Sequence, residues 1–143
     1  MIARRIDWEQ RLIAYLHSVR KLPLVYGQHD CCLHTCAVIE ALTGVDVATP
    51  FRGRYNCRLS ALKVMREVTG SSTLRGLADF IARQHEIPQH EDPILAARGD
   101  PVLYRYDGQE PLLAIAYGSI VLAVGTNGLY RVPLHSAVAA WRI

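Results

Sequence analysis

The first two thirds of the chain carry apolar side chains at helical spacing. In residues 7–20 these side chains recur every three or four positions, at Trp8, Leu12, Tyr15, Leu16 and Val19. This period predicts a helix with one buried face. Asp7 followed by Gln10 resembles a capping box at its start, and Pro23 ends it.

Three further segments carry helix signals. Residues 30–42 open on a favourable N-cap residue, Asp30, and Gly44 follows where a left-handed residue is preferred. The segment from Ser60 to Gly70 has the same signals at its two ends. Residues 73–84 place leucine, phenylalanine and isoleucine on one side. We therefore expect four helices in this part of the chain.

The last third changes to short apolar or alternating runs, which predict strands. These runs are residues 101–106, 112–118, 119–125, 128–133 and 139–143. Asp107-Gly108 and Asn127-Gly128 supply turn residues between them. Helices followed by a meander of strands predict a single α+β domain over residues 1–143, with N-terminal helices packed on a C-terminal antiparallel sheet.

Composition and charge narrow the possible classes of protein. Of the 143 residues, 50% are hydrophobic and 20% charged, as in ordinary globular domains. The net charge of +3 comes from scattered arginines and not from a basic cluster, so we expect no dedicated binding of nucleic acid. The longest apolar run, Leu112–Val124, is interrupted by Gly118 and Ser119 and is shorter than the roughly 20 residues of a membrane span.

The beginning of the sequence and its cysteines indicate a compartment. Polar residues follow the first arginines, where a secretory signal would place an apolar block. Cys31 and Cys32 are adjacent, which disfavours two disulfides among the four cysteines. We therefore expect a cytosolic, membrane-free protein with free thiols.

The segment "GQHDCCLHTCAVIE", residues 27–40, holds three of the four cysteines and two of the six histidines. Structural zinc sites usually pair ligands from two distant segments. Adjacent helical residues instead point about 100° apart, so this cluster cannot converge on one ion. A zinc site would need Cys32 and Cys36 with distant ligands such as Cys57, and the spacing does not demand one. We expect no metal and no other cofactor.

Within the cluster, the cysteines divide into two kinds. Cys32 and Cys36 lie four apart beside Ile39 and suit a buried helix face. Cys31 occupies the first helical position after Asp30, where unpaired N–H groups and the helix dipole favour a thiolate. Position alone leaves Cys31 open to two interpretations, a catalytic nucleophile or an exposed, unused thiol.

Two motifs carry a resemblance to a known family. With "LPLVYGQHDCCLHTCAVIEALTG" and "RGDPVLYRY", the chain resembles the NlpC-type cysteine peptidases, papain-like enzymes that cut the peptide stems of bacterial cell walls. Asp30-Cys31 matches the family's helix-opening dipeptide, Gly99-Asp100 its later Gly-Asp, and Tyr26-Gly27 its aromatic-glycine element. "FRGRY", "RGD" and "AWRI" are similar to small proteins encoded in tail modules of phages and prophages. The resemblance implies a papain-like fold.

The sequence departs from the peptidase pattern at the positions that matter for catalysis. The resemblance implies a base histidine at the start of the strand over residues 112–118, but that position is Leu112. Leu24 stands where the family has a tyrosine near the nucleophile, and the next strand, "IVLAVG", lacks the family's third polar residue. A leucine cannot accept a proton, so the resemblance implies a site without its usual base.

Another histidine would have to replace that base, because a cysteine protease normally needs an imidazole within about 3–4 Å of its thiol. His135, between the late strands, is the candidate. His29 and His34 are close to Cys31 in sequence, but we expect both at the surface, where histidine is common.

The segment "PFRGRYNCR" offers candidate binding residues. Arg52, Arg54 and Tyr55 suit a carboxylate or phosphate, which arginine binds through paired N–H donors. The alternative, slightly favoured, is a loop that joins the second helix to the third, with arginines stacked on Phe51 and Tyr55. Residues 98–100, "RGD", are interpreted as the start of a strand and not as an adhesion signal.

Three functional hypotheses follow. The favoured one is a phage or prophage tail-assembly or tail-tip protein with an inactive papain-like site, which binds other tail proteins in the host cytoplasm or in the virion tail. The second is an active thiol hydrolase of cell-wall peptides, with Cys31 as nucleophile and His135 as base. The third is a zinc-stabilised binding module built on Cys32 and Cys36.

Overall fold

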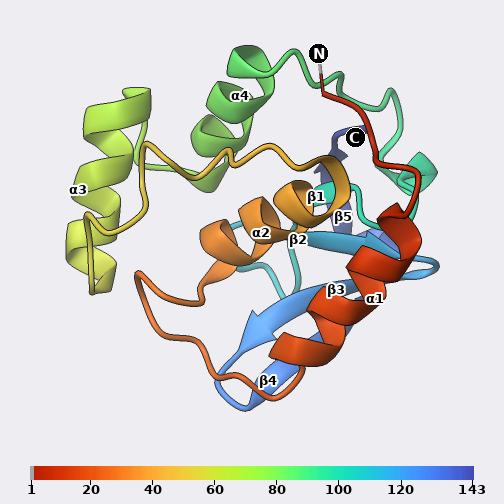
Figure 1. The fold of residues 1–143 in the computed structure, drawn as a ribbon. Coiled ribbons are helices and arrows are strands. Elements are labelled where there is room, and N and C mark those ends of the chain that lie inside the picture. Colours follow the sequence, from red (N-terminus) through yellow and green to blue (C-terminus); the bar gives the residue numbers. More distant parts are fainter. Residues whose placement is uncertain (1) are drawn as a thin grey trace.

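The computed structural model describes residues 2–143, which form four α-helices followed by five strands (Figure 1). The helices are α1 (Trp8–Val19), α2 (Cys31–Thr43), α3 (Arg58–Thr69) and α4 (Leu74–Gln84). The strands are β1 (Pro101–Tyr104), β2 (Leu112–Tyr117), β3 (Ile120–Gly125), β4 (Gly128–Pro133) and β5 (Ala137–Ala140). Two 3-10 turns are η1 (Pro93–Leu95) and η2 (Leu134–Ser136). Within residues 2–143, no helix combines the length and apolar character that a membrane crossing requires.

All five strands belong to one antiparallel sheet with the order β4-β3-β2-β1-β5. The strands β1 to β4 follow one another as a meander, and β5 returns to the free side of β1. In the register of the first hairpin, Leu112 at the start of β2 lies opposite Tyr104 at the end of β1. The prediction of an α+β fold, with helices followed by an antiparallel sheet, is confirmed.

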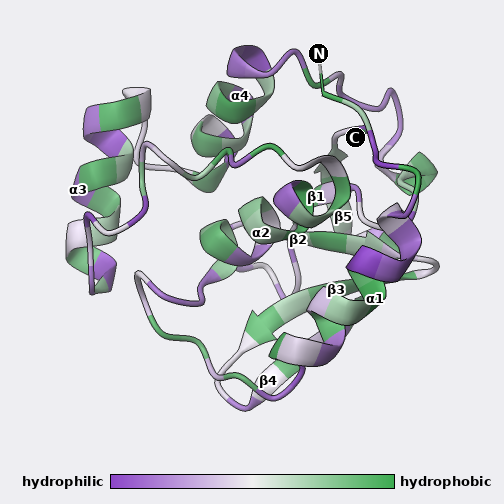
Figure 2. Cartoon of the chain, viewed as in Figure 1, coloured by the Kyte–Doolittle hydropathy of each residue, from purple (hydrophilic) through white to green (hydrophobic). Residues whose placement is uncertain are grey.

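Helix α2 is the central helix, because it packs against α1 on one side and against β2 on the other. Figure 2 shows that the strands behind it are largely hydrophobic, and most residues of α2 are buried. Cys32 and Cys36 retain 7% and 1% of their exposure, which confirms the prediction that they fill the core.

His29 and His34 were expected at the surface, and this expectation is wrong because α2 and the residues just before it are buried. His34 has 0% exposure; its Nδ1 lies 2.9 Å from the Tyr15 hydroxyl of α1 and its Nε2 lies 3.4 Å from the Leu122 carbonyl of β3. His29 is also buried, and its ring packs edge-on against His34 with 5.7 Å between centroids. The partners of His34 come from elements distant in sequence, which is why the local pattern does not reveal them.

The sheet is strongly curled. The hydroxyls of Tyr104 on β1 and Tyr130 on β4 hydrogen-bond to each other, although two strands separate β1 from β4 in the sheet. Inside the curl lies a second apolar core, to which Val102, Ala114 and Val132 belong. The turns η1 and η2 contact each other, and η1 also contacts β5. The sheet therefore has buried side chains on both faces.

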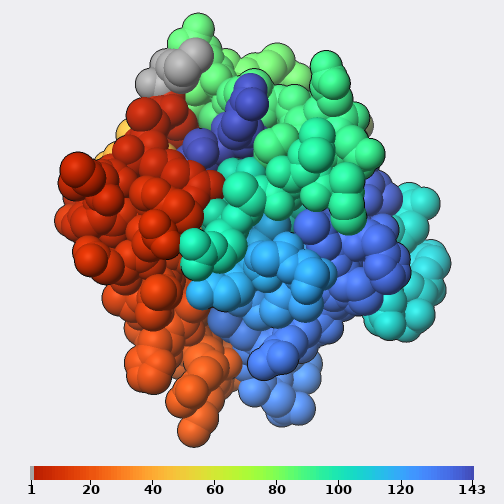
Figure 3. Space-filling model, turned by 90° about the vertical axis from the view of Figure 1, so that its right-hand side faces the viewer, coloured from red at the N-terminus to blue at the C-terminus, as the bar shows by residue number. Residues whose placement is uncertain are grey.

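Asp100 joins the two ends of the described chain. Its Oδ1 accepts from Arg4 at 2.9 Å and from the Ile143 backbone N–H at 3.1 Å, and its Oδ2 lies 2.8 Å from His90 Nε2. Figure 3 shows the first residues, in red, beside the last ones, in dark blue. Asp100 of the "RGD" segment is 1% exposed and directly precedes β1. The segment therefore forms the start of a strand, as the sequence predicts.

Several predicted boundaries and caps differ from the structure. Asp7 makes no capping bond to α1, because its carboxylate pairs with Arg11 at 2.9 Å. Helix α3 begins at Arg58 and not at Ser60, since the Cys57 sulfur accepts from the Ser60 N–H and serves as the N-cap. The last strand ends at Ala140, earlier than predicted.

Candidate functional site

Asp30 positions the start of α2. Its backbone is extended, and its Oδ1 accepts from the Leu33 N–H at 2.9 Å, so the predicted N-cap is present. Its Oδ2 accepts from the Gly27 N–H at 2.9 Å and from the Tyr55 hydroxyl at 2.7 Å. Gly27 has φ of 85°, and a side chain there would collide with the Tyr55 carbonyl. Three donors from three segments therefore hold a carboxylate that is only 2% exposed.

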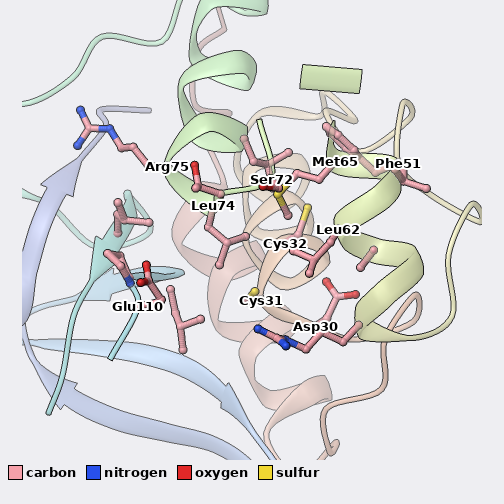
Figure 4. Close-up of a pocket in the computed structure, with 18 of the residues that line it drawn as sticks. Asp30, Cys31, Cys32, Phe51, Leu62, Met65, Ser72, Leu74, Arg75 and Glu110 are labelled. Carbon is pink, nitrogen blue, oxygen red and sulfur yellow. The ribbon is translucent and has the colours of Figure 1, made fainter. Parts of the chain in front are cut away.

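Cys31 follows as the first residue of α2 and is partly exposed. Figure 4 shows its sulfur at the bottom of an open space between the sheet on one side and α3 on the other. The backbone N–H of Leu113, on β2, lies close enough to act on this sulfur as a hydrogen-bond donor. The end of α2 that carries the thiol is thus covered by the sheet and open toward a pocket.

The pocket has a volume of about 740 Å³ and is lined by helices α2, α3 and α4, by the loops beside them and by strands of the sheet. Leu62 and Met65 come from α3, and Leu74 comes from α4. Leu103 and Leu112 come from the first hairpin of the sheet. A cavity of this size is typical of sites that take small ligands or short peptide segments.

The thiol at the bottom of this pocket is not activated. Burial raises the pKa of Cys31 to about 12, and the negative charge of Asp30 adds to this. The N–H groups of Leu113 and of the helix start lower the pKa by less than burial raises it. Cys31 is therefore a protonated thiol at neutral pH, in contrast to the thiolate that a helix N-terminus alone favours.

Histidine is missing from this pocket. None of the histidines in residues 2–143 lines it, whereas Leu112 does. His135 lies in η2, exposed to solvent and outside the pocket lining. His29 and His34 are buried behind the start of α2, and burial lowers the pKa of both. The structure therefore brings Cys31 together with Leu112 and not with a candidate base.

The candidate binding residues of the arginine-rich loop have partners within the chain. Arg52 forms an ion pair with Asp46, and Arg54 pairs with Glu67 of α3 at 3.1 Å. Within the described chain neither guanidinium stacks on Phe51 or Tyr55, contrary to the expectation; Phe51 packs edge-on against another phenylalanine. Of the three candidates, only Tyr55 lines the pocket.

The remaining cysteines do not form a metal centre. Cys32 and Cys36 contact each other in the core, whereas Cys57 is exposed at the start of α3. In residues 2–143, no three histidine, cysteine, aspartate or glutamate side chains are grouped so as to hold an ion. The zinc hypothesis therefore lacks a ligand set in this part of the chain.

Sequence reasoning missed several residues of the pocket. Arg75, Arg105 and Glu110 line it, and they come from segments interpreted only as a helix start, a strand and a turn. The apolar side of α3, with Leu62 and Met65 three apart, was a visible signal. The spacing predicts that this side of α3 is shielded from solvent, but it does not predict which other element faces it.

Together, the fold and the site define an α+β protein with a protonated thiol at the start of a central helix and a large, mainly apolar pocket beside it. The chain belongs to a family described as a domain of unknown function (DUF6950), whose model matches residues 3–143. No curated protein and no solved structure matches the chain. The family domain thus coincides with nearly the whole α+β unit.

Proposed function

We propose that this protein is a phage or prophage tail-assembly or tail-tip component, built on a papain-like fold of the NlpC type whose peptidase site has lost its activity. One observation carries the proposal. Leu112, at the position where the resembled peptidases place their base histidine, lines the same pocket as Cys31. The nucleophile position and the base position thus share a site, and the base position holds an aliphatic side chain.

The papain-like part of the proposal is supported by the arrangement around α2. The Asp-Cys dipeptide opens a helix that packs on β2, and the Gly-Asp dipeptide directly precedes β1. These are the places that the resemblance assigns to the two motifs. The hairpin register puts the first residue of β2 at the pocket.

The inactive part of the proposal is supported by the chemistry of the thiol. A neutral thiol is a poor nucleophile, and Leu112 cannot take its proton. Loss of the base removes the catalytic chemistry but leaves the volume and the apolar lining of the pocket. We therefore assign the protein to assembly with other tail proteins and not to bond cleavage.

The active hydrolase remains the second candidate because Cys31 does reach a pocket large enough for a substrate. His135 would have to leave its exposed place in η2 and approach the thiol. This candidate predicts release of products from cell-wall peptides, abolished by Cys31→Ala. The favoured proposal predicts equal, background release from both proteins.

Co-expression with the proteins encoded beside it tests the tail assignment. We expect a stable complex with at least one tail protein, seen as co-elution in size-exclusion chromatography with a fixed ratio of the two chains. The Cys31→Ala variant should form the same complex, because the thiol has no catalytic part in it. Failure to associate with any neighbouring tail protein contradicts the assignment.

The lost base can be tested separately by restoring it. Leu112→His should place an imidazole in the pocket and increase alkylation of Cys31 by iodoacetamide at neutral pH about tenfold or more. Leu59→His is the matched control, because Leu59 is 79% exposed on α3 and outside the pocket lining. Equal rates in the two variants contradict the assignment of residue 112 as the former base position.

A further inference from the structure

Two cationic side chains at the pocket have no partner in the described chain. Arg58, the first residue of α3, and Arg105, the residue after β1, are both exposed and line the pocket. Within residues 2–143, neither guanidinium makes a hydrogen bond, an ion pair or a ring contact. Arg75, also in the lining, differs because it pairs with Asp79 at 3.2 Å. Two guanidinium groups are therefore available to a ligand.

The charge around the pocket is positive overall. Three arginines face two carboxylates, Asp30 and Glu110. The Asp30 carboxylate already accepts three hydrogen bonds from the chain, and these stabilise its negative charge. Unpaired guanidinium groups at a rim of this kind favour a carboxylate or phosphate, which they bind through two parallel N–H donors.

The interior walls are apolar. On α3, Val64 alone among the residues of the helix is buried, while Leu62 and Met65 face the pocket. Figure 4 shows Leu62 and Met65 on the α3 side and Leu74 on the α4 side, around Cys31 and Cys32. An apolar wall beside a cationic rim is complementary to a molecule with a hydrocarbon body and an anionic end.

The strands that reach the pocket offer little free edge. β1 is paired on both sides, with β2 and β5, and β2 is paired with β1 and β3. β5, which contributes Val138, is the last strand of the sheet, and its Ala140 carbonyl accepts the backbone N–H of His90 at 2.8 Å. An extended peptide usually binds by adding to an unpaired strand edge, which supplies partners for its backbone groups. An aliphatic chain needs no such partners. The pocket of about 740 Å³ therefore favours a hydrocarbon chain over an extended peptide.

We propose that this pocket binds an amphipathic carboxylate, with its aliphatic chain along the α3 and α4 side and its carboxylate held by Arg58 and Arg105. The ligand is of the fatty-acid class. This inference goes beyond the proposed function and does not depend on it, because it uses the pocket alone.

Isothermal titration of the whole protein with decanoate tests the proposal. We expect saturable 1:1 binding, and octanoate should bind about 15-fold more weakly, at about fourfold for each methylene lost. Decanol and decyltrimethylammonium, which keep the chain but lack the anion, should bind at least about tenfold more weakly than decanoate. Equal affinity for decanol and decanoate, or no saturable binding, overturns the proposal.

Variants assign the binding to this pocket. Arg58→Gln and Arg105→Gln should each weaken decanoate about tenfold and leave decanol unchanged. Arg66→Gln is the matched control, because Arg66 lies on α3 outside the pocket lining. Ala61→Phe, which fills the pocket from α3, should weaken every ligand, and an unchanged circular dichroism spectrum shows that the fold is kept.

A further titration, with a peptide, distinguishes two possible sources of an apolar carboxylate, a fatty acid and a protein C-terminus. A short acetylated peptide that ends in leucine carries a free carboxylate beside an apolar side chain, as decanoate does. Tighter binding of this peptide than of decanoate overturns the proposal and assigns the pocket to a protein C-terminus. Neither result alters the tail-complex experiment, which measures association of whole proteins with or without a ligand.

Discussion

The Tyr55 hydroxyl donates a 2.7 Å hydrogen bond to Asp30 Oδ2 and so ties the loop before α3 to the start of α2. The same oxygen accepts the Gly27 N–H at 2.9 Å. This contact joins two sequence motifs that were interpreted separately, the arginine-rich loop and the Asp-Cys dipeptide. The loop therefore supports the bottom of the pocket through its tyrosine, while Arg52 and Arg54 form ion pairs elsewhere.

Removal of that hydroxyl should weaken the fold measurably. Tyr55→Phe is expected to lower the free energy of unfolding by about 1–2 kcal/mol, because a buried carboxylate loses one of its three donors. Urea denaturation measures this change. Tyr106→Phe is the matched control, since Tyr106 is 49% exposed. Equal, near-zero changes in both variants contradict the role given to Tyr55.

Thiol reactivity should single out Cys57 and not Cys31. Cys57 is exposed, and hydrogen bonds from Ser60 lower its pKa, whereas burial raises the pKa of Cys31 to about 12. Iodoacetamide should therefore alkylate Cys57 first, as peptide mass spectrometry can show. In a Cys57→Ser background, the labelling rate of Cys31 should rise about tenfold per pH unit up to about pH 10. A plateau below about pH 8.5 indicates an activated thiol and favours the hydrolase.

The buried cysteines should matter for stability. Cys36→Ser is expected to cost about 1–3 kcal/mol, because the new hydroxyl is placed in an apolar core without a partner. Cys31→Ser should cost little, since residue 31 is partly exposed at the pocket. Differential scanning calorimetry compares the two variants. Equal losses contradict the division of the cluster into core and pocket thiols.

His34 should make the protein sensitive to acid. Burial lowers the pKa of His34 from 6.5 to about 4, so between these values the unfolded chain binds a proton that the folded protein does not. The stability from His34 is therefore complete above pH 6.5 and is lost as the pH falls toward 4, by up to about 3 kcal/mol.

Urea denaturation from about pH 7 to about pH 5 measures this loss. The His34→Gln variant has no imidazole at this position, and its stability should fall less steeply over the same range. His17→Gln, at an exposed site on α1, should keep the slope of the parent protein. An unchanged slope in His34→Gln assigns the acid sensitivity to other groups.

Local signals were enough to predict the elements of this fold. Asp30 and Gly44 bound α2 because a side-chain cap and a left-handed residue act within one turn of the helix. The change from helical to short alternating runs near residue 100 predicts helices followed by an antiparallel meander. The separation of Cys32 and Cys36 from Cys31 also follows from helical geometry alone.

The long-range environment of each group was decided by tertiary structure. His34 is buried because Tyr15 and the Leu122 carbonyl, both distant in sequence, satisfy its ring nitrogens. The pKa of Cys31 is raised because the surrounding chain shields its sulfur from water beside the Asp30 carboxylate, although residue 31 as a whole is partly exposed; this outweighs the effect of the helix start. Arg58 and Arg105 lie 47 positions apart in the sequence, and only the tertiary fold, which sets α3 across the pocket from the first hairpin, brings them to one pocket. A sequence pattern predicts which face of a helix or strand is buried. The pKa values and the binding sites depend on which other elements pack against that face.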